Sequence, residues 1–219
     1  MFLQPQFAEF GKQVVLFAHI TNQIEGHPHD DLLVRKGRTG FPSFVYMDAD
    51  GEMLALGGAR TVEGFEKSLA EAQEMAALAA KAKAGDADAD RTVFLKRLSW
   101  HGVPFEAAKA KVAALKLDEA EAKQAASALL TLELNDARLT PDKKAGLAKL
   151  MKIHAEGRVP TDPRAAAGYW RMVAMGAERE KDVAAYTKYV EYLRAASADE
   201  PRMKTQLDRA EAVLAAMAK

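Results

Sequence analysis

The stretch GRTGFPSFVYMDADGEMLA, residues 37–55, decides most of what this sequence indicates about its fold. Two β-forming runs, FVYM at 44–47 and MLAL at 53–56, flank the polar segment DADGE. Asp50 and Gly51 are the kind of pair that adopts the left-handed backbone conformations of a hairpin turn. We therefore predict that residues 40–56 form a turn followed by a β-hairpin.

Toward the N-terminus, the pattern alternates between helix and strand. Residues 5–12 place Phe7 and Phe10 on one face of a short predicted helix. The run VVLFAHI at 14–20 is typical of a buried strand in a parallel sheet. A polar loop follows, and then a short helix around DLLVRKG that Gly37 ends as a C-cap.

Toward the C-terminus, the sequence predicts helices. Thr61 is a candidate N-cap for a helix that the linker AGDADAD at 84–90 ends. Later start signals include the Asp118–Glu121 capping box and Asp162 before Pro163. Further helices are predicted near residues 88–101, 104–115, 119–135, 141–156, 163–179, 182–197 and 201–218.

Composition divides the chain and excludes several function classes. Residues 1–60 hold most of the Phe and His, whereas the rest is rich in Ala, Lys, Glu and Leu, so we predict domains at 1–84 and 85–219. The formal net charge of zero gives no basic footprint for nucleic acid. No apolar run approaches the roughly 18 residues of a membrane span. The first residues lack signal-peptide features, and the sequence leaves the location unknown: cytoplasmic for the chain as written, periplasmic or secreted if a signal segment lies upstream.

The residues GFP, followed by DADGE and the predicted hairpin, carry a resemblance to a known family. They fit the pattern G-[FY]-P-x-x-x-x-x-D-x-x-G-x-x-L at Gly40, Phe41, Pro42, Asp48, Gly51 and Leu54. Over about residues 1–75, this pattern resembles the second half of a thioredoxin-superfamily domain. The resemblance implies an α/β thioredoxin-like unit followed by an all-α helical-hairpin domain, with a cis peptide bond before Pro42.

The resemblance also implies missing parts. A complete domain of this family begins with a strand and a Cys-x-x-Cys helix, but the chain has no cysteine and therefore cannot perform thiol–disulfide exchange. The absent strand would be central, between 14–20 and 44–47. Three closures are possible: direct pairing of these two runs, a strand from a second copy, or residues upstream of Met1. Direct pairing is the expectation we adopt.

Two further resemblances concern the helical half. The segments GYWRMVAMGAERE, DVAAYTKYVEYLRAA and PRMKTQLDRAEAVLAAMA are similar to tetratricopeptide-like helical hairpins, although no 34-residue period repeats. The order of a thioredoxin-like domain and a helical domain is also that of glutathione transferases. Here, however, LGGART at 56–61 stands where that family places its Glu-Ser pair, so this enzyme class remains a remote alternative.

Three of the five histidines, His19, His27 and His29, fall close together beside Asp30 and Asp31. The His-Pro-His spacing offers two imidazoles of the kind that Zn, Cu or Ni binds. A solvated loop explains the same residues more simply, because no helical i, i+4 pair presents the rings. We expect no metal or other cofactor, with the three histidines as the alternative.

These observations favour a non-catalytic binding or scaffold protein that acts through protein–protein contacts, including possible self-association. The alternative is a fragment of a thiol–disulfide oxidoreductase or redox chaperone whose Cys-x-x-Cys lies upstream. Tyr186, Tyr189 and Tyr192 share a helix face that is more typical of a core than of a groove. The candidate partner-binding residues are Gly40, Phe41, Pro42, Ser43, Tyr169 and Trp170.

Overall fold

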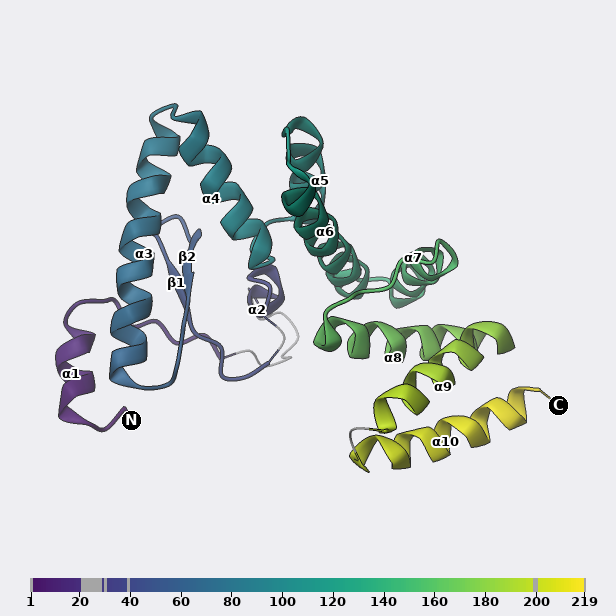
Figure 1. Ribbon diagram of the computed structural model, residues 1–219. Helices are drawn as coiled ribbons and strands as arrows, with labels where there is room; N and C mark the ends of the chain where they lie inside the picture. Colours follow the sequence, from purple (N-terminus) through teal and green to yellow (C-terminus); the bar gives the residue numbers. More distant parts are fainter. Residues whose placement is uncertain (1, 21–28, 30, 39, 199–200, 219) are drawn as a thin grey trace. The chain divides into compact units, whose positions relative to one another are not determined.

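The computed structural model describes residues 2–20, 29, 31–38, 40–198 and 201–218. Internal contacts divide the chain into two compact units, Met1–Leu132 and Glu133–Lys219, which we describe separately. The boundary predicted from composition, between residues 84 and 85, falls in the loop between α3 and α4 (Figure 1). That domain division stays a prediction.

The first unit contains one β-hairpin and several helices. Its elements are α1 (Pro5–Gly11), α2 (Leu32–Arg35), β1 (Val45–Met47), β2 (Met53–Leu56), α3 (Val62–Lys83), α4 (Ala87–Ser99), α5 (Phe105–Ala114) and the first part of α6 (Glu119–Leu139). The predicted helix near 88–101 thus begins slightly earlier, because Asp86 caps it by accepting hydrogen bonds from the backbone N–H groups of Asp88 and Ala89.

The predicted β-hairpin is confirmed. β1 pairs antiparallel with β2, with Val45 opposite Leu56 and an irregularity after Tyr46. The Asp48 carboxylate accepts the backbone N–H groups of residues 50 and 52, and Gly51 adopts a φ of 77° that an L side chain rarely tolerates. The predicted cis bond between Phe41 and Pro42 is also present.

The expected thioredoxin-like α/β unit is wrong. The sheet of the described residues has two strands, β1 and β2, rather than the larger sheet of that fold. VVLFAHI forms no strand there, so the expected pairing between 14–20 and 44–47 is also wrong. A run of β-forming residues becomes a strand only when a neighbour takes up its backbone hydrogen bonds, and β propensity alone does not supply that neighbour.

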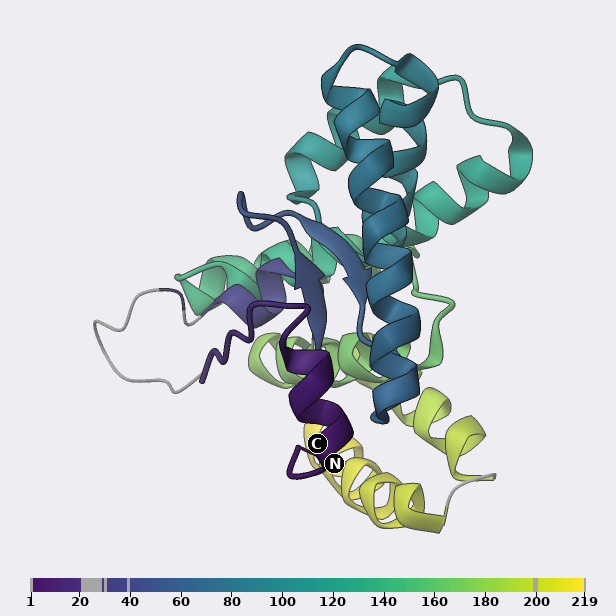
Figure 2. The same cartoon turned by 90° about the vertical axis from the view of Figure 1, so that its left-hand side faces the viewer.

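The hairpin packs against α3, whose buried face continues onto α4 (Figures 1 and 2). Met53 of β2 and Met75 of α3 are almost fully buried, and Phe65 in the first turn of α3 is buried against the ring of Phe44. Thr61 caps α3 as predicted, accepting the N–H of Gly64 at 3.1 Å. This long amphipathic helix therefore holds both the hairpin and α4.

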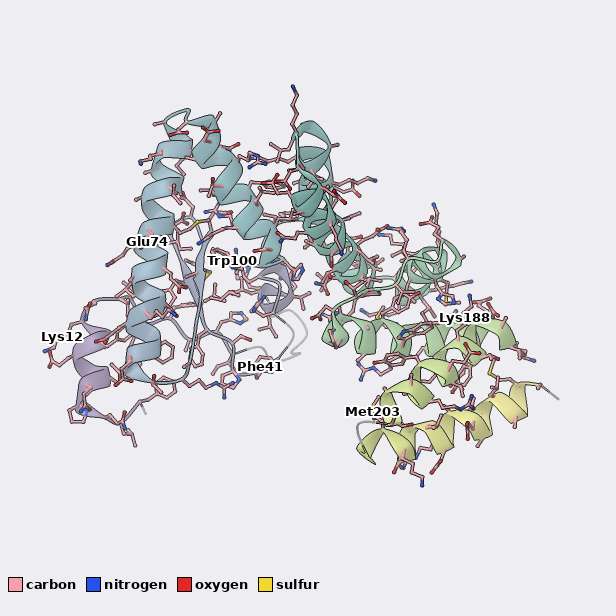
Figure 3. All side chains as sticks on the ribbon, in the orientation of Figure 1. Lys12, Phe41, Glu74, Trp100, Lys188 and Met203 are labelled. Atoms are coloured by element: carbon pink, nitrogen blue, oxygen red, sulfur yellow. The ribbon has the colours of Figure 1, made fainter. Side chains whose placement is uncertain are left out.

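α2 lies against the C-terminal end of α4, close to Trp100 (Figure 3). Gly37 ends α2 with a φ of 65°, and a Cβ there would lie 2.3 Å from the carbonyl oxygen of Trp100. The Arg38 guanidinium donates to the same carbonyl oxygen at 3.1 Å. The predicted glycine cap is confirmed, and this close backbone approach adds a second reason for glycine at this position.

A second core joins α4 to α5 and α6. Its buried side chains include Phe94, Leu98, Ala108 and Leu132. The predicted capping box at the start of α6 is confirmed, because Asp118 accepts the N–H of Glu121 while Glu121 accepts the N–H of Asp118.

The second unit continues α6 and adds α7 (Lys143–Ala155), α8 (Pro163–Glu180), α9 (Val183–Ser197) and α10 (Pro201–Met217). Each of these later helices packs on the next one along the chain (Figure 1). Asp162 caps α8 and Asp182 caps α9 through their carboxylates. The described residues after 88 contain no strand, which confirms the prediction of a helical C-terminal region.

Candidate protein-interaction surfaces

The first candidate surface is the loop of residues 40–43, which precedes β1. Phe41 is 68% exposed on this loop (Figure 3). Ser43 donates its hydroxyl to the carbonyl oxygen of Gly40, and Arg60 donates to that of Pro42 at 3.4 Å. Local hydrogen bonds thus fix the loop while the aromatic ring faces solvent. This arrangement leaves the Phe41 ring available for a partner.

The second candidate surface is the run of residues 14–20, which the sequence placed in a buried sheet. Its large apolar side chains are instead exposed: Val15 by 97%, Leu16 by 62%, Phe17 by 69% and Ile20 by 77%. These are the residue types most often buried in folded proteins. We call residues 14–20 the apolar segment.

The third candidate surface is the edge of β1 that faces away from β2. The carbonyl oxygen of Phe44 accepts from Gly57, and the N–H of Asp48 donates to Glu52. Backbone groups alternate in direction along a strand, so those of Val45 and Met47 point to the opposite edge. No third strand lies along that edge within the part of the chain that the structure describes.

The candidate aromatic residues of the second unit are packed within it. Tyr169 is 1% exposed, and its hydroxyl shares a hydrogen bond of 2.7 Å with Nδ1 of His154. Burial raises the pKa of Tyr169 to about 12. Burial, and secondarily the charge of Lys188, lowers the pKa of His154 below its ordinary value. At neutral pH the pair therefore consists of a neutral phenol and a neutral imidazole.

Trp170 is half-buried and lies against α9. Its ring stacks on Tyr192, with centroids 5.7 Å apart and an interplanar angle of 19°. Tyr186 of α9 is 3% exposed, and burial raises its pKa, with a smaller contribution from its hydrogen bond to Glu178. The geometry thus gives these aromatic rings a packing role, and a partner-binding role for Tyr169 and Trp170 remains a hypothesis.

The histidine alternative is only partly covered by the structure. His19 lies in the apolar segment next to the ring of Phe17, and Nδ1 of His29 is 3.3 Å from the guanidinium of Arg35. His27 lies outside the described residues. Among those that are described, no three His, Asp or Glu side chains are grouped closely enough to hold a metal ion.

A hollow that the sequence did not predict lies between α1 and the first turn of α3. Its volume is about 680 Å³. Phe10 is its one buried lining residue, and the rest are mostly Gln and Glu side chains that also meet solvent, including Gln6, Glu9, Glu63 and Glu66. None of these polar side chains is buried and directed at a ligand, so the hollow lacks the convergent polar groups of a small-molecule site.

The helices of the described chain also include none with the length and apolar character needed to cross a bilayer. Comparison with protein-family models, with curated proteins and with solved structures gives no match.

Proposed function

We propose that this protein is a non-catalytic binding or scaffold protein, and that its apolar segment is the main contact surface. The observation that supports the proposal is the exposure of Val15, Leu16, Phe17 and Ile20 within one short stretch. Scattered exposed apolar residues are ordinary, but a concentration of large ones marks interaction surfaces. Phe41 offers a further aromatic anchor of the kind that dominates interface energies.

The free energy gained by burying these side chains is large enough to contribute to binding. Fully burying one Val, Leu, Ile or Phe side chain stabilises by about 1.5–3 kcal/mol, so four such side chains together offer at most about 6–12 kcal/mol. Association costs about 4–15 kcal/mol in lost translational and rotational freedom. Apolar contact alone is thus comparable with the cost, and a specific complex needs additional hydrogen bonds.

The experiment that tests this function is photo-crosslinking in cells that produce the full chain. A benzophenone amino acid replaces Phe17 in one variant, and Met175 in the matched control. Met175 lies on α8 and is 60% exposed, so both probes reach solvent to a similar extent. A contact surface at the apolar segment predicts one discrete crosslinked protein at position 17 and none at position 175.

A further variant, with two added substitutions, checks that the crosslinked product depends on the apolar segment. Adding Leu16→Lys and Ile20→Lys to the position-17 variant is expected to abolish the discrete product, because charged side chains resist burial. Equal, diffuse labelling at positions 17 and 175 would contradict the proposed function.

A further inference from the structure

The apolar segment and the outer edge of β1 are complementary in their backbone hydrogen bonding. The segment consists of β-forming, apolar residues that belong to no strand in the described structure. The edge of β1 presents the backbone N–H and C=O groups of Val45 and Met47 to a side where the described residues place no strand. Each feature lacks what the other supplies: a strand neighbour for the segment and a third strand for the sheet.

Neither run carries the charged or proline residues that often protect such edges, although β1 is itself only three residues long with an irregularity after Tyr46. Exposed strand edges are usually blunted by Lys, by Pro or by an inward-pointing charge, because they otherwise pair with other chains. The runs VVLFAHI and FVYM contain no Lys, Arg, Asp, Glu or Pro. The hairpin already packs on α3, and a third strand would add backbone hydrogen bonds along the outer edge of β1.

We propose that two copies of this chain exchange these elements, so that the apolar segment of each copy pairs with the outer edge of β1 in the other. The proposal rests on the proposed function and names its partner. The segment adds a third strand beside β1, and its backbone supplies the hydrogen bonds that apolar contact alone does not. This is strand addition, a common mode of recognition at sheet edges.

A second copy fits better than an unrelated partner because one chain carries both halves of the contact. A two-fold arrangement uses each half twice and closes on itself, as isologous dimers do. Side chains of this size expose on the order of 100 Å² each, so the four of each copy give about 800 Å² in total. The surface that they cover brings the interface toward the roughly 1,200 Å² of small specific complexes.

The absence of cysteine allows a direct test by disulfide trapping, since only introduced thiols can react. Full-length Val45→Cys protein is mixed with Leu16→Cys or with Phe17→Cys protein under mild oxidation. In the proposed pairing the middle of the segment lies opposite Val45, and adjacent residues of a strand face opposite sides, so one of Leu16 and Phe17 has its side chain on the same face as Val45, as a disulfide requires. The control partner is Met175→Cys, on an exposed position of α8.

Exchange predicts that one of the two mixtures forms the mixed disulfide dimer about tenfold or more faster than the control, because the complex raises the local thiol concentration. Control-level rates for both pairs would overturn the proposal.

Sedimentation of the unmodified chain supplies the second measurement. The wild type is expected to sediment with twice the mass of one chain at high concentration, and Phe17→Lys as a single chain. Val45→Pro should also dissociate the dimer, because it removes an N–H that faces away from β2 while leaving the hairpin hydrogen bonds in place. Met175→Lys should remain dimeric at high concentration. In dilute solution, where both variants are single chains, its thermal unfolding should match that of Phe17→Lys.

The outcomes separate the two proposals. A single chain at every concentration, together with a different protein crosslinked at position 17, overturns strand exchange and leaves the binding function intact. A single chain with no discrete crosslink overturns both. A dimer that Phe17→Lys and Val45→Pro leave unchanged overturns strand exchange, because it forms through another surface.

Discussion

Two regions of this molecule are rich in large apolar and aromatic side chains, but one is buried and the other is exposed. On α8 and α9, Tyr169 and Tyr186 are buried and Trp170 stacks on a neighbouring ring. In the apolar segment, Val15 and Phe17 are left in solvent. The difference teaches that apolar composition does not by itself decide burial. What decides it is whether the chain brings a partner surface to the residues.

The physical reason lies in where each element finds its hydrogen bonds. A helix satisfies its backbone internally, and short loops bring the next helix against its apolar stripe. A strand satisfies its backbone only through a neighbour, which here would be distant in sequence or in another molecule. The α8–α9 pair therefore packs locally, whereas the apolar segment does not.

The largest effect that tests this contrast is expected at Tyr169. Tyr169→Ala should destabilise the second unit by about 3–5 kcal/mol, because it leaves a cavity and removes the hydrogen-bond partner of His154. Tyr169→Phe keeps the ring and should cost only about 1–2 kcal/mol. Urea unfolding of the full chain, followed by circular dichroism, measures both. Equal, small losses would mean that the ring is not a core residue.

A smaller loss is expected at Trp170, which is half-buried. Trp170→Ala should cost about 2 kcal/mol, below the range for a fully buried aromatic ring. Trp170→Phe retains part of the stack on Tyr192 and should recover much of this stability. If Trp170→Ala leaves the unfolding midpoint unchanged, the packing role fails and a partner-binding role gains support.

The free energy of unfolding of the second unit should also depend on pH, with a smaller effect than that of Trp170→Ala and with a sign set by His154. Because the folded pKa of His154 is lowered, the unfolded chain binds more protons below its ordinary pKa of about 6.5. The free energy of unfolding should be constant above that pH. It should fall as the pH drops toward the lowered pKa of His154 in the folded protein. The slope for one proton is at most about 1.4 kcal/mol per pH unit.

His154→Asn provides the control for this titration, since the amide can still bond to Tyr169 but does not titrate in this range. Urea midpoints at pH 7.5 and 5.5 should differ less in this variant than in the wild type. An unchanged difference would assign the pH dependence to other groups.

The smallest effect on stability is expected in the apolar segment. Phe17→Lys should change the free energy of unfolding of a single chain by no more than about 0.5 kcal/mol, as at other exposed sites. Thermal unfolding of dilute protein, compared with Met175→Lys, measures it. A loss as large as that of Tyr169→Ala would show that the segment packs inside its own chain and would remove the contrast between the two regions.

Some parts of the fold follow from local chemistry and could be predicted. Thr61 and Asp162 start helices because their side chains accept free N–H groups, and the Asp118–Glu121 pair does so reciprocally. Gly51 forms the hairpin turn because its φ is positive. These signals lie within a few residues of the structure that they determine, so no distant contact is needed to read them.

The candidate site was predictable only in part. Phe41 was singled out from the sequence, and the structure leaves it exposed. The apolar segment was predicted as a buried strand and not as a contact surface. A run such as VVLFAHI has the same composition whether it lies in a buried sheet or is exposed.

The sequence by itself determined where most helices begin, several of their caps, the hairpin turn and the absence of cysteine from the chain, because each depends on residues close together in the chain or on composition. It did not determine every helix end: the helix predicted at 119–135 runs to Leu139. Only the tertiary structure decided that Tyr169 is buried against His154, that Val15 and Phe17 remain exposed, and that the sheet of the described residues has two strands. Burial depends on which surfaces meet in space. A strand in particular is stable only when a neighbour, from the same chain or from another, completes its hydrogen bonds.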